Sequence, residues 1–214
     1  MTVALLPVVT SGVLMGWSVA WPPGPINTEI ARRCLARGFW AGFSLILGAC
    51  SGDALWALLV ALGVGLLFTG PTAQLFMGVL SIGLLAVLMV TFLRRAVQGW
   101  RGGEAQSDGP RFDSAKASYV LGATMALTSP WNVTFWLAAV GRPGMSDLGL
   151  PVLLLTVVAV IAGAAAWGLV WSATVVIAHR RVGAGGRWGA VLMNGGTALL
   201  MLWFIVEAVM KLSA

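Results

Sequence analysis

Charged residues are scarce in this sequence, and long apolar runs take their place. Only 9% of the 214 residues are Asp, Glu, Lys or Arg, whereas 59% are apolar, and the mean hydropathy is +0.92. A soluble domain of this length could not bury so much apolar surface. The composition therefore excludes a soluble fold and predicts an all-α integral membrane protein, in which about six spans of roughly 20 residues use most of the chain.

Residue types that serve redox chemistry, metal binding and catalysis are also few. The two cysteines, Cys34 and Cys50, form no C-x-x-C pair, and the single histidine, His179, stands beside arginines in an expected loop. No cluster of ligand side chains suggests a tightly held metal, and no Ser or Cys has a base within a motif. A phosphate-binding G-x-x-x-x-G-K-[ST] loop is absent, so direct drive by ATP is not expected. We expect no enzyme, no metal and no cofactor.

Basic residues outnumber acidic ones, giving a net charge of +6. Eleven of the thirteen basic residues fall in three connections between expected spans: Arg32, Arg33, Arg37, Arg94, Arg95, Arg101, Arg111, Lys116, Arg180, Arg181 and Arg187. The positive-inside rule places these connections in the cytoplasm and both termini outside. The charge then serves topology and anionic lipid headgroups, and no nucleic-acid partner is expected.

Prolines interrupt two of the apolar segments. The stretch 21–27 reads WPPGPIN, and Pro25-Ile26-Asn27 returns 105 residues later as Pro130-Trp131-Asn132. Each proline removes a backbone donor, and in hydrocarbon such a break survives only where it is buried in protein or lines a polar cavity. Two broken helices at corresponding places in two halves point to the binding site of a transporter.

Hydropathy predicts six transmembrane helices, the first followed by a short helical piece: 2–20 with 26–36, 39–67, 72–93, 117–140, 148–178 and 188–210. We expect a first three-helix repeat over residues 1–93, a cytoplasmic linker over 94–116 and a second three-helix repeat over 117–214. Since each half has an odd number of spans, a duplicated unit must be inverted relative to its twin.

Asp53 is the lone charge near the middle of the span 39–67. A carboxylate at this depth costs about 2.5–3.5 kcal/mol on insertion scales. Desolvation penalises its charged form, which would suit reversible protonation. The small residues Gly48 and Gly52 before it allow another backbone to come close. Asp53 is thus a candidate proton carrier or partner of a substrate ammonium, and the alternative is a carboxylate that bonds the broken backbone and never titrates.

Asn27 and Asn132 each follow a proline by two residues, so each is expected to cap the half-helix that begins there. A helix N-terminus offers partial positive charge and free N–H groups to a carboxylate. Two facing breaks could hold an amino acid by its carboxylate while Asp53 meets the ammonium. The alternative is that both asparagines only cap.

Two pairs spaced by one helical turn leave alternatives open. Glu29 and Arg33 suit a local ion pair near the cytoplasmic end of the short helical piece, although Glu29 could also be a second titratable site. Trp167 and Trp171 fit an interfacial belt, or they face the pathway.

Several stretches resemble the LysE/RhtB family of amino-acid exporters. Residues 23–27 (PGPIN) are similar to its PGPN-like break, 37–42 (RGFWAG) to a G-x-x-x-G step, and 48–56 (GACSGDALW) to a G-x-x-x-G-D element. Residues 128–132 (TSPWN) stand where the family shows an N-P-K-like element, without its lysine. Carried over residue by residue, the candidate substrate-binding and coupling residues are Pro23, Gly24, Pro25, Asn27, Gly48, Gly52, Asp53, Pro130 and Asn132.

The resemblance implies a carrier in the bacterial cytoplasmic (inner) membrane that exports amino acids such as lysine, arginine, threonine or homoserine, with protons as the coupling ion. Two rivals stay open: a divalent cation exporter of the same superfamily, and a membrane assembly module without a transport cycle. The glycine-rich faces Gly38/Gly42 and Gly48/Gly52 suit a homodimer or packing within one chain.

Overall fold

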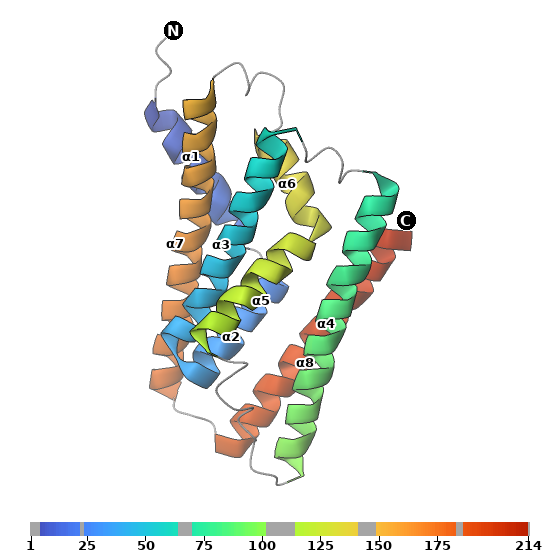
Figure 1. Ribbon diagram of the computed structural model, residues 1–214. Coiled ribbons are helices and arrows are strands. Elements are labelled where there is room, and N and C mark those ends of the chain that lie inside the picture. Colours follow the sequence, from blue (N-terminus) through green and yellow to red (C-terminus); the bar gives the residue numbers. More distant parts are fainter. Residues whose placement is uncertain are drawn as a thin grey trace.

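The computed structural model describes residues 5–21, 24–63, 70–101, 114–140, 149–182 and 186–213. Every regular element in these ranges is a helix, which confirms the all-α prediction (Figure 1). In chain order the helices are α1 (Leu5–Ala20), α2 (Pro25–Arg37), α3 (Phe39–Ala61), α4 (Pro71–Trp100), α5 (Ala115–Thr128), α6 (Pro130–Val140), α7 (Leu150–Val182) and α8 (Gly186–Ser213).

Proline and glycine set the helix boundaries around the first break. Pro25 is the first helical residue of α2, where its missing N–H costs nothing, and Gly24 before it is extended with φ −144° and ψ 179°. Gly38 ends α2 with φ +86°, a left-handed conformation that favours glycine, and α3 begins at the next residue. At the second break, one extended residue, Ser129, separates α5 from α6.

Length and apolar composition identify the membrane-crossing helices. Three helices of the described chain can each span a bilayer: Phe39–Ala61, Leu75–Trp100 and Leu150–Arg180. The pair α1 and α2, which meet at 77°, qualifies as a fourth span when taken together. Helix α4 continues through Trp100, beyond residue 93 where we expect the first repeat to end. The protein is therefore a multi-pass helical membrane protein.

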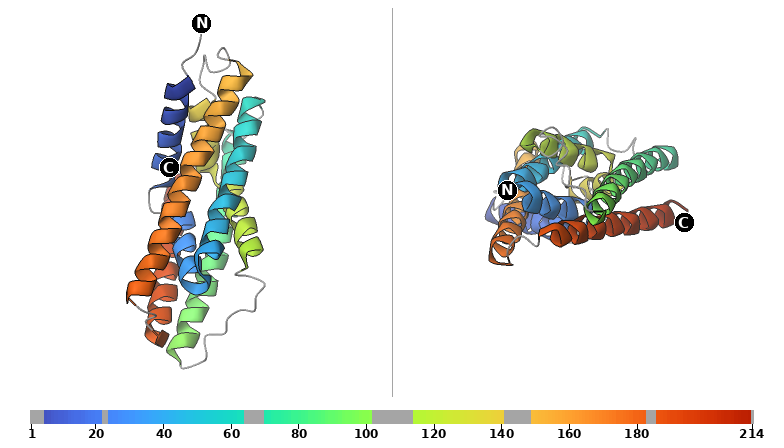
Figure 2. Two further views of the ribbon diagram at one scale, coloured as in Figure 1. Left: turned by 90° about the vertical axis from the view of Figure 1, so that its left-hand side faces the viewer. Right: turned by 90° about the horizontal axis from the view of Figure 1, so that it is seen from below.

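The helices associate mainly in three pairs: α1 with α7, α3 with α5, and α4 with α8. Figure 1 shows α4 and α8 running together along one side of the bundle, and the view from below in Figure 2 shows this pair extending away from α1 and α7. Helix α2 contacts α3, α7 and α8, so it joins the two parts.

Glycines allow the α1–α7 and α3–α5 pairs to touch backbone to backbone. A Cβ at Gly16 of α1 would fall on the carbonyl oxygen of Val160 and 3.0 Å from the amide nitrogen of Ala164. The same holds on the other side, where a Cβ at Gly122 of α5 would fall on the carbonyl oxygen of Leu45 and 3.0 Å from the amide nitrogen of Ala49.

The partner helices α7 and α3 also each contribute a glycine, and these two glycines make matching contacts. Gly163 of α7 lies against the carbonyl oxygen of Val13 in α1, and Gly48 of α3 lies against that of Tyr119 in α5. Gly52 and Gly42 also pack within the chain, on α5 and α2 respectively. Small-residue packing of this kind suits a membrane interior, where helices associate by close contact rather than by the hydrophobic effect.

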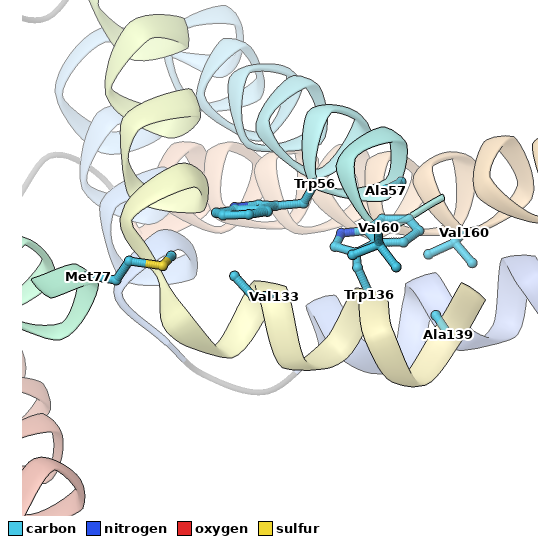
Figure 3. Packing of buried hydrophobic residues seen from close by; sticks show 8 residues of the cluster. All are labelled: Trp56, Ala57, Val60, Met77, Val133, Trp136, Ala139 and Val160. Atoms are coloured by element: carbon cyan, nitrogen blue, oxygen red, sulfur yellow. The ribbon is translucent and has the colours of Figure 1, made fainter. Parts of the chain in front are cut away.

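One apolar cluster fills the bundle beside the second break (Figure 3). Its two largest members are Trp56 of α3 and Trp136 of α6, which are 4% and 1% exposed. The indole N–H of Trp56 donates to the carbonyl oxygen of Ala126 over 3.3 Å, so the side chain also satisfies a carbonyl near the end of α5.

Candidate functional site

The two helix breaks line one small cavity. It has a volume of about 90 Å³ and is lined by both breaks, by the end of α5 and by α4: Pro25, Ile26, Ser81, Leu84, Leu85, Met125, Thr128, Ser129 and Asn132. Two of the expected residues, Pro25 and Asn132, thus meet at this cavity. Pro130 begins α6 next to it, and Gly24 precedes α2. Pro23 lies outside the described residues.

Asp53 is tied to the second break. The amide Nδ2 of Asn132 donates to Oδ1 of Asp53 over 2.8 Å, and the indole N–H of Trp136 donates to the same oxygen over 3.4 Å. Asp53 is half-buried, and both of these donors are neutral. Gly48 and Gly52 are buried against α5, and this close packing brings the carboxylate to the break.

Asn27 makes a similar link at the first break. Its Nδ2 donates to the carbonyl oxygen of Ala20, the last residue of α1, over 2.7 Å. Its Oδ1 accepts from the indole N–H of Trp167 over 3.3 Å, and its backbone oxygen accepts from that of Trp171 over 3.0 Å. With 9% exposure, Asn27 is a buried connector between α1, α2 and α7.

The prediction that both asparagines cap their half-helices is wrong. Asn27 is the third residue of α2, the cap position belongs to Gly24, and no side-chain cap bond forms there. Asn132 is likewise the third residue of α6, and its amide donates back to the carbonyl oxygen of Ala126 over 3.1 Å. Since proline takes the first helical position, an asparagine two residues later lies inside the helix and reaches the preceding half-helix instead.

The predicted ion pair of Glu29 and Arg33 is confirmed, but it belongs to a larger buried cluster. Glu29 has no exposed surface and accepts two hydrogen bonds from Arg32, of 2.8 and 2.9 Å, and one from Arg33 of 2.7 Å. Arg33 also donates to the hydroxyl of Ser118 in α5 over 2.6 Å. Arg32 and Arg33 lie on α2, as predicted for the short helical piece, but at 3% and 4% exposure they are enclosed between helices and do not form an exposed connection.

Two larger cavities flank α2. One of about 720 Å³ lies between α2, α4 and α5 and contains the Glu29 cluster in its wall. It shares Leu84 with the small cavity between the breaks. The other, of about 640 Å³, lies between α2, α7 and α8, where Trp167 and Trp171 line it with Asn27. The two tryptophans therefore face a cavity, and that this cavity belongs to a pathway stays a prediction.

Sequence reasoning missed three residues of this region: Arg32, Ser118 and Trp136. Trp136 follows Asn132 by one helical turn, and Arg32 follows Glu29 by three residues. Helical spacing could therefore have indicated that each lies next to a residue already considered for the site. A further signal was available for Arg32, because any charged residue is unusual in so apolar a chain. Nothing in the sequence singles out Ser118. Among the described residues, no group of three or more His, Cys, Asp and Glu side chains could hold a metal ion.

The structure thus defines a multi-pass helical membrane protein in which two broken helices share a cavity and a half-buried carboxylate adjoins one of them. The family model of the LysE type translocator matches residues 17–212. The chain belongs to this family.

Two curated relatives align with about three fifths of the chain. "Chemotactic transduction protein ChpE" of Pseudomonas aeruginosa is 30% identical over 132 residues, which is 62% of this chain and 63% of the relative. "Putative amino acid efflux protein YcgF" of Bacillus subtilis is 24% identical over 136 residues, 61% of each chain. The chain thus spans less than two thirds of either relative's own length. No solved structure matches it.

Proposed function

We propose that this protein is a secondary transporter that exports amino acids or close derivatives across the bacterial inner membrane, driven by the proton gradient. The observation that carries the proposal is the cavity lined by both helix breaks, with Asn132 bonded to Asp53 beside it. Irregular backbone at such depth suits a polar binding site. The family assignment and the name of the Bacillus relative support the substrate class.

Asp53 carries the proton in this proposal. As a carboxylate it accepts hydrogen bonds from Asn132 and Trp136, which tie α3 to α6. A proton on Asp53 neutralises the acceptor and weakens both bonds, because charge-assisted hydrogen bonds are roughly twice as strong as neutral ones. Protonation then loosens α6 from α3, and proton release restores the tie.

The proposed fold has six spans in two inverted halves, residues 1–93 and 117–214, joined by the linker 94–116. In it, α1 with α2 forms one broken span and α5 with α6 forms another. The matching glycine contacts of the α1–α7 and α3–α5 pairs support this arrangement. Export proceeds by rocking one half against the other around the shared cavity.

In the proposed orientation both termini lie outside, which the distribution of basic residues supports through the positive-inside rule. The 720 Å³ cavity then opens toward the cytoplasm, since Arg95, Ser114 and Lys116 near the linker line it. Cytoplasmic substrate enters this cavity and passes Leu84 to reach the space between the breaks.

Amino-acid flux in proteoliposomes under an imposed pH gradient tests the proposal. The wild type, Asp53→Asn and the control Ser44→Ala are compared with pooled labelled amino acids; Ser44 is a half-buried position on the same helix whose hydroxyl donates to the carbonyl oxygen of Trp40. Flux of a subset in the wild type and the control, lost in Asp53→Asn, is the expected result. Equal flux in all three proteins removes Asp53 from the cycle, and no flux in correctly inserted wild type overturns amino-acid transport.

A further inference from the structure

The 640 Å³ cavity between α2, α7 and α8, which we call the tryptophan cavity, lies beside α2 like the cavity through which substrate is proposed to enter. Three tryptophans line it: Trp21, which follows the last residue of α1, and Trp167 and Trp171 of α7. Small-molecule sites have volumes of about 300–1,000 Å³. The size of the tryptophan cavity therefore suits a small organic ligand.

The three indoles form a continuous row. The ring centre of Trp167 lies 4.7 Å from that of Trp21, with the planes tilted by 43°, and 6.0 Å from that of Trp171, with the planes 13° from parallel. Trp167 is only 9% exposed, whereas Trp21 is 59% exposed and Trp171 is half-buried. The middle ring is therefore enclosed, and the two outer rings can present aromatic surface to a ligand.

Hydrogen bonds hold the two indoles of α7 in place. The N–H of Trp167 donates to Oδ1 of Asn27, and the N–H of Trp171 donates to the backbone oxygen of the same residue. An indole has this one donor and no acceptor. With the donors engaged at the first break, both side chains have only ring surface left for a ligand.

Polar side chains of the cavity wall are engaged as well. The hydroxyl of Thr28 donates to the carbonyl oxygen of Gly24 over 3.0 Å. Arg32, the one charged side chain among the described residues that line the cavity, is bonded to the buried Glu29. Aliphatic residues supply much of the remaining wall: Ala31, Leu35, Leu192 and Leu200. A charged ligand would lose its water to groups that already have partners, so the wall favours an uncharged one.

We infer that the tryptophan cavity is a binding site for an uncharged aromatic molecule, whose ring packs against the indoles of Trp21 and Trp171. Aromatic rings in offset or edge-to-face contact attract one another beyond the area that they bury. A lipid acyl chain, the other candidate in a membrane, would gain burial alone from the same wall. The row of indoles therefore favours the ring over the chain.

Occupancy of this site is expected to slow export. Trp21 and α2 belong to the first proposed half of the protein, and α7 and α8 belong to the second. A ligand that contacts both halves favours the arrangement to which it binds. This effect on export rests on the proposed transport function, whereas the binding site itself does not.

Three uncharged alcohols of seven carbons test the preference for an aromatic ring: benzyl alcohol, cyclohexylmethanol and 1-heptanol. Each is used to displace tritiated indole from the intact protein in lipid nanodiscs, with the uptake of empty nanodiscs subtracted and free aqueous concentrations compared. The two saturated alcohols are more hydrophobic, so a plain apolar groove would bind them more tightly. Benzyl alcohol is instead expected to displace indole at a concentration about fivefold lower than either, which corresponds to one favourable aromatic pair.

Trp21→Leu tests the wall directly, because Trp21 is exposed and leucine keeps the position apolar. The affinity for indole is expected to fall about fivefold, whereas Trp21→Phe, which keeps an aromatic ring, should change it about twofold or less. Trp203→Leu is the matched control. Trp203 is an exposed tryptophan of α8 that does not line the cavity, so this variant should bind indole as the wild type does.

Three results would overturn the site: no saturable uptake of indole above that of empty nanodiscs, a saturated alcohol as the strongest competitor, or equal indole affinity in Trp21→Leu and the control. A first rank for 1-heptanol would assign the cavity to a lipid acyl chain.

Amino-acid flux in proteoliposomes separates the site from the transport function. Indole is expected to slow flux in the wild type and in Trp203→Leu more than in Trp21→Leu. Equal slowing in all three proteins would overturn the effect on export, while the binding data still decide the site. Saturable, ring-selective binding without any flux in the wild type would support the site and overturn the transport function.

Discussion

The two broken helices share a backbone arrangement but differ in what they hold. At each break an asparagine in the third helical position donates to a carbonyl near the end of the preceding helix, Ala20 for Asn27 and Ala126 for Asn132. Asn27 also accepts from tryptophan donors of α7, whereas Asn132 donates to Asp53 of α3. The contacts described at the first break are with neutral groups, and those at the second include an acidic side chain.

A second difference lies in the half-helices that follow the breaks. Helix α2 carries the buried Glu29–Arg32–Arg33 cluster. Helix α6 has no charged residue and packs apolar residues such as Val133 and Trp136 into the core. The two half-helices therefore differ in charge: α2 carries a buried ionic cluster beside the large cavity, and α6 contacts the carboxylate of α3 through its neutral Asn132.

Substitution of the crossing glycines tests whether the two helix pairs are equivalent. Gly16→Ala and Gly122→Ala each place a Cβ on a backbone carbonyl that cannot move aside. Each is expected to lower the free energy of unfolding by about 3 kcal/mol, near the upper end for overpacking. Thermal unfolding in detergent measures the loss. Gly83→Ala in α4, where a Cβ meets nothing within 4 Å, is the control. A large effect at one glycine and none at the other would break the equivalence.

Removal of the two asparagines tests the difference between the breaks. Asn27→Ala leaves the indole of Trp167 and the carbonyl of Ala20 without this buried partner, so stability should fall by about 1–3 kcal/mol while flux is retained in protein that folds. Asn132→Ala should reduce flux far more than stability, since it removes the contact to Asp53. Unfolding and proteoliposome flux are measured for both variants. Equal flux losses would mean that the breaks do not differ in function.

The smallest effects are expected from two tryptophan substitutions, which should differ in whether they change the pH dependence of flux. Trp136→Phe removes the N–H that reaches Asp53 and keeps the aromatic body in the core, so the pH dependence of flux should shift. Trp167→Phe removes the N–H to Asn27 and should cost about 1 kcal/mol of stability without a change in that pH dependence. If the pH dependence of flux shifted in both variants, or in neither, the proposal that Asp53 carries the proton would be contradicted.

Prolines and a lone carboxylate were enough to predict where the helices break and which acidic residue adjoins a break. Composition predicted the all-α membrane class because continuous apolar runs of about 20 residues cross a bilayer as helices, which satisfy their own backbone groups. The capping rule failed at Asn27 and Asn132 because proline at the first helical position moved the cap to the residue before it. Whether the asparagine or the residue before the proline takes the cap position can be decided from the sequence only once the start of the helix is known.

The Arg32 and Arg33 cluster was not predictable for a different reason. Local spacing gives the contact to Glu29, but burial comes from α5, whose Ser118 is distant in the chain. The positive-inside rule reads every arginine near a span as a loop charge. It cannot separate an exposed arginine, such as Arg37, from one enclosed between helices.

The contact between Trp136 and Asp53 also gives the protein a built-in optical reporter. An indole whose N–H lies 3.4 Å from a carboxylate oxygen feels the full electric field of that charge. A change in the charge of Asp53 alters this field, which shifts the emission of Trp136. Fluorescence of the wild type compared with Trp136→Phe therefore reads the state of the carboxylate in real time, without a label and without a transported substrate.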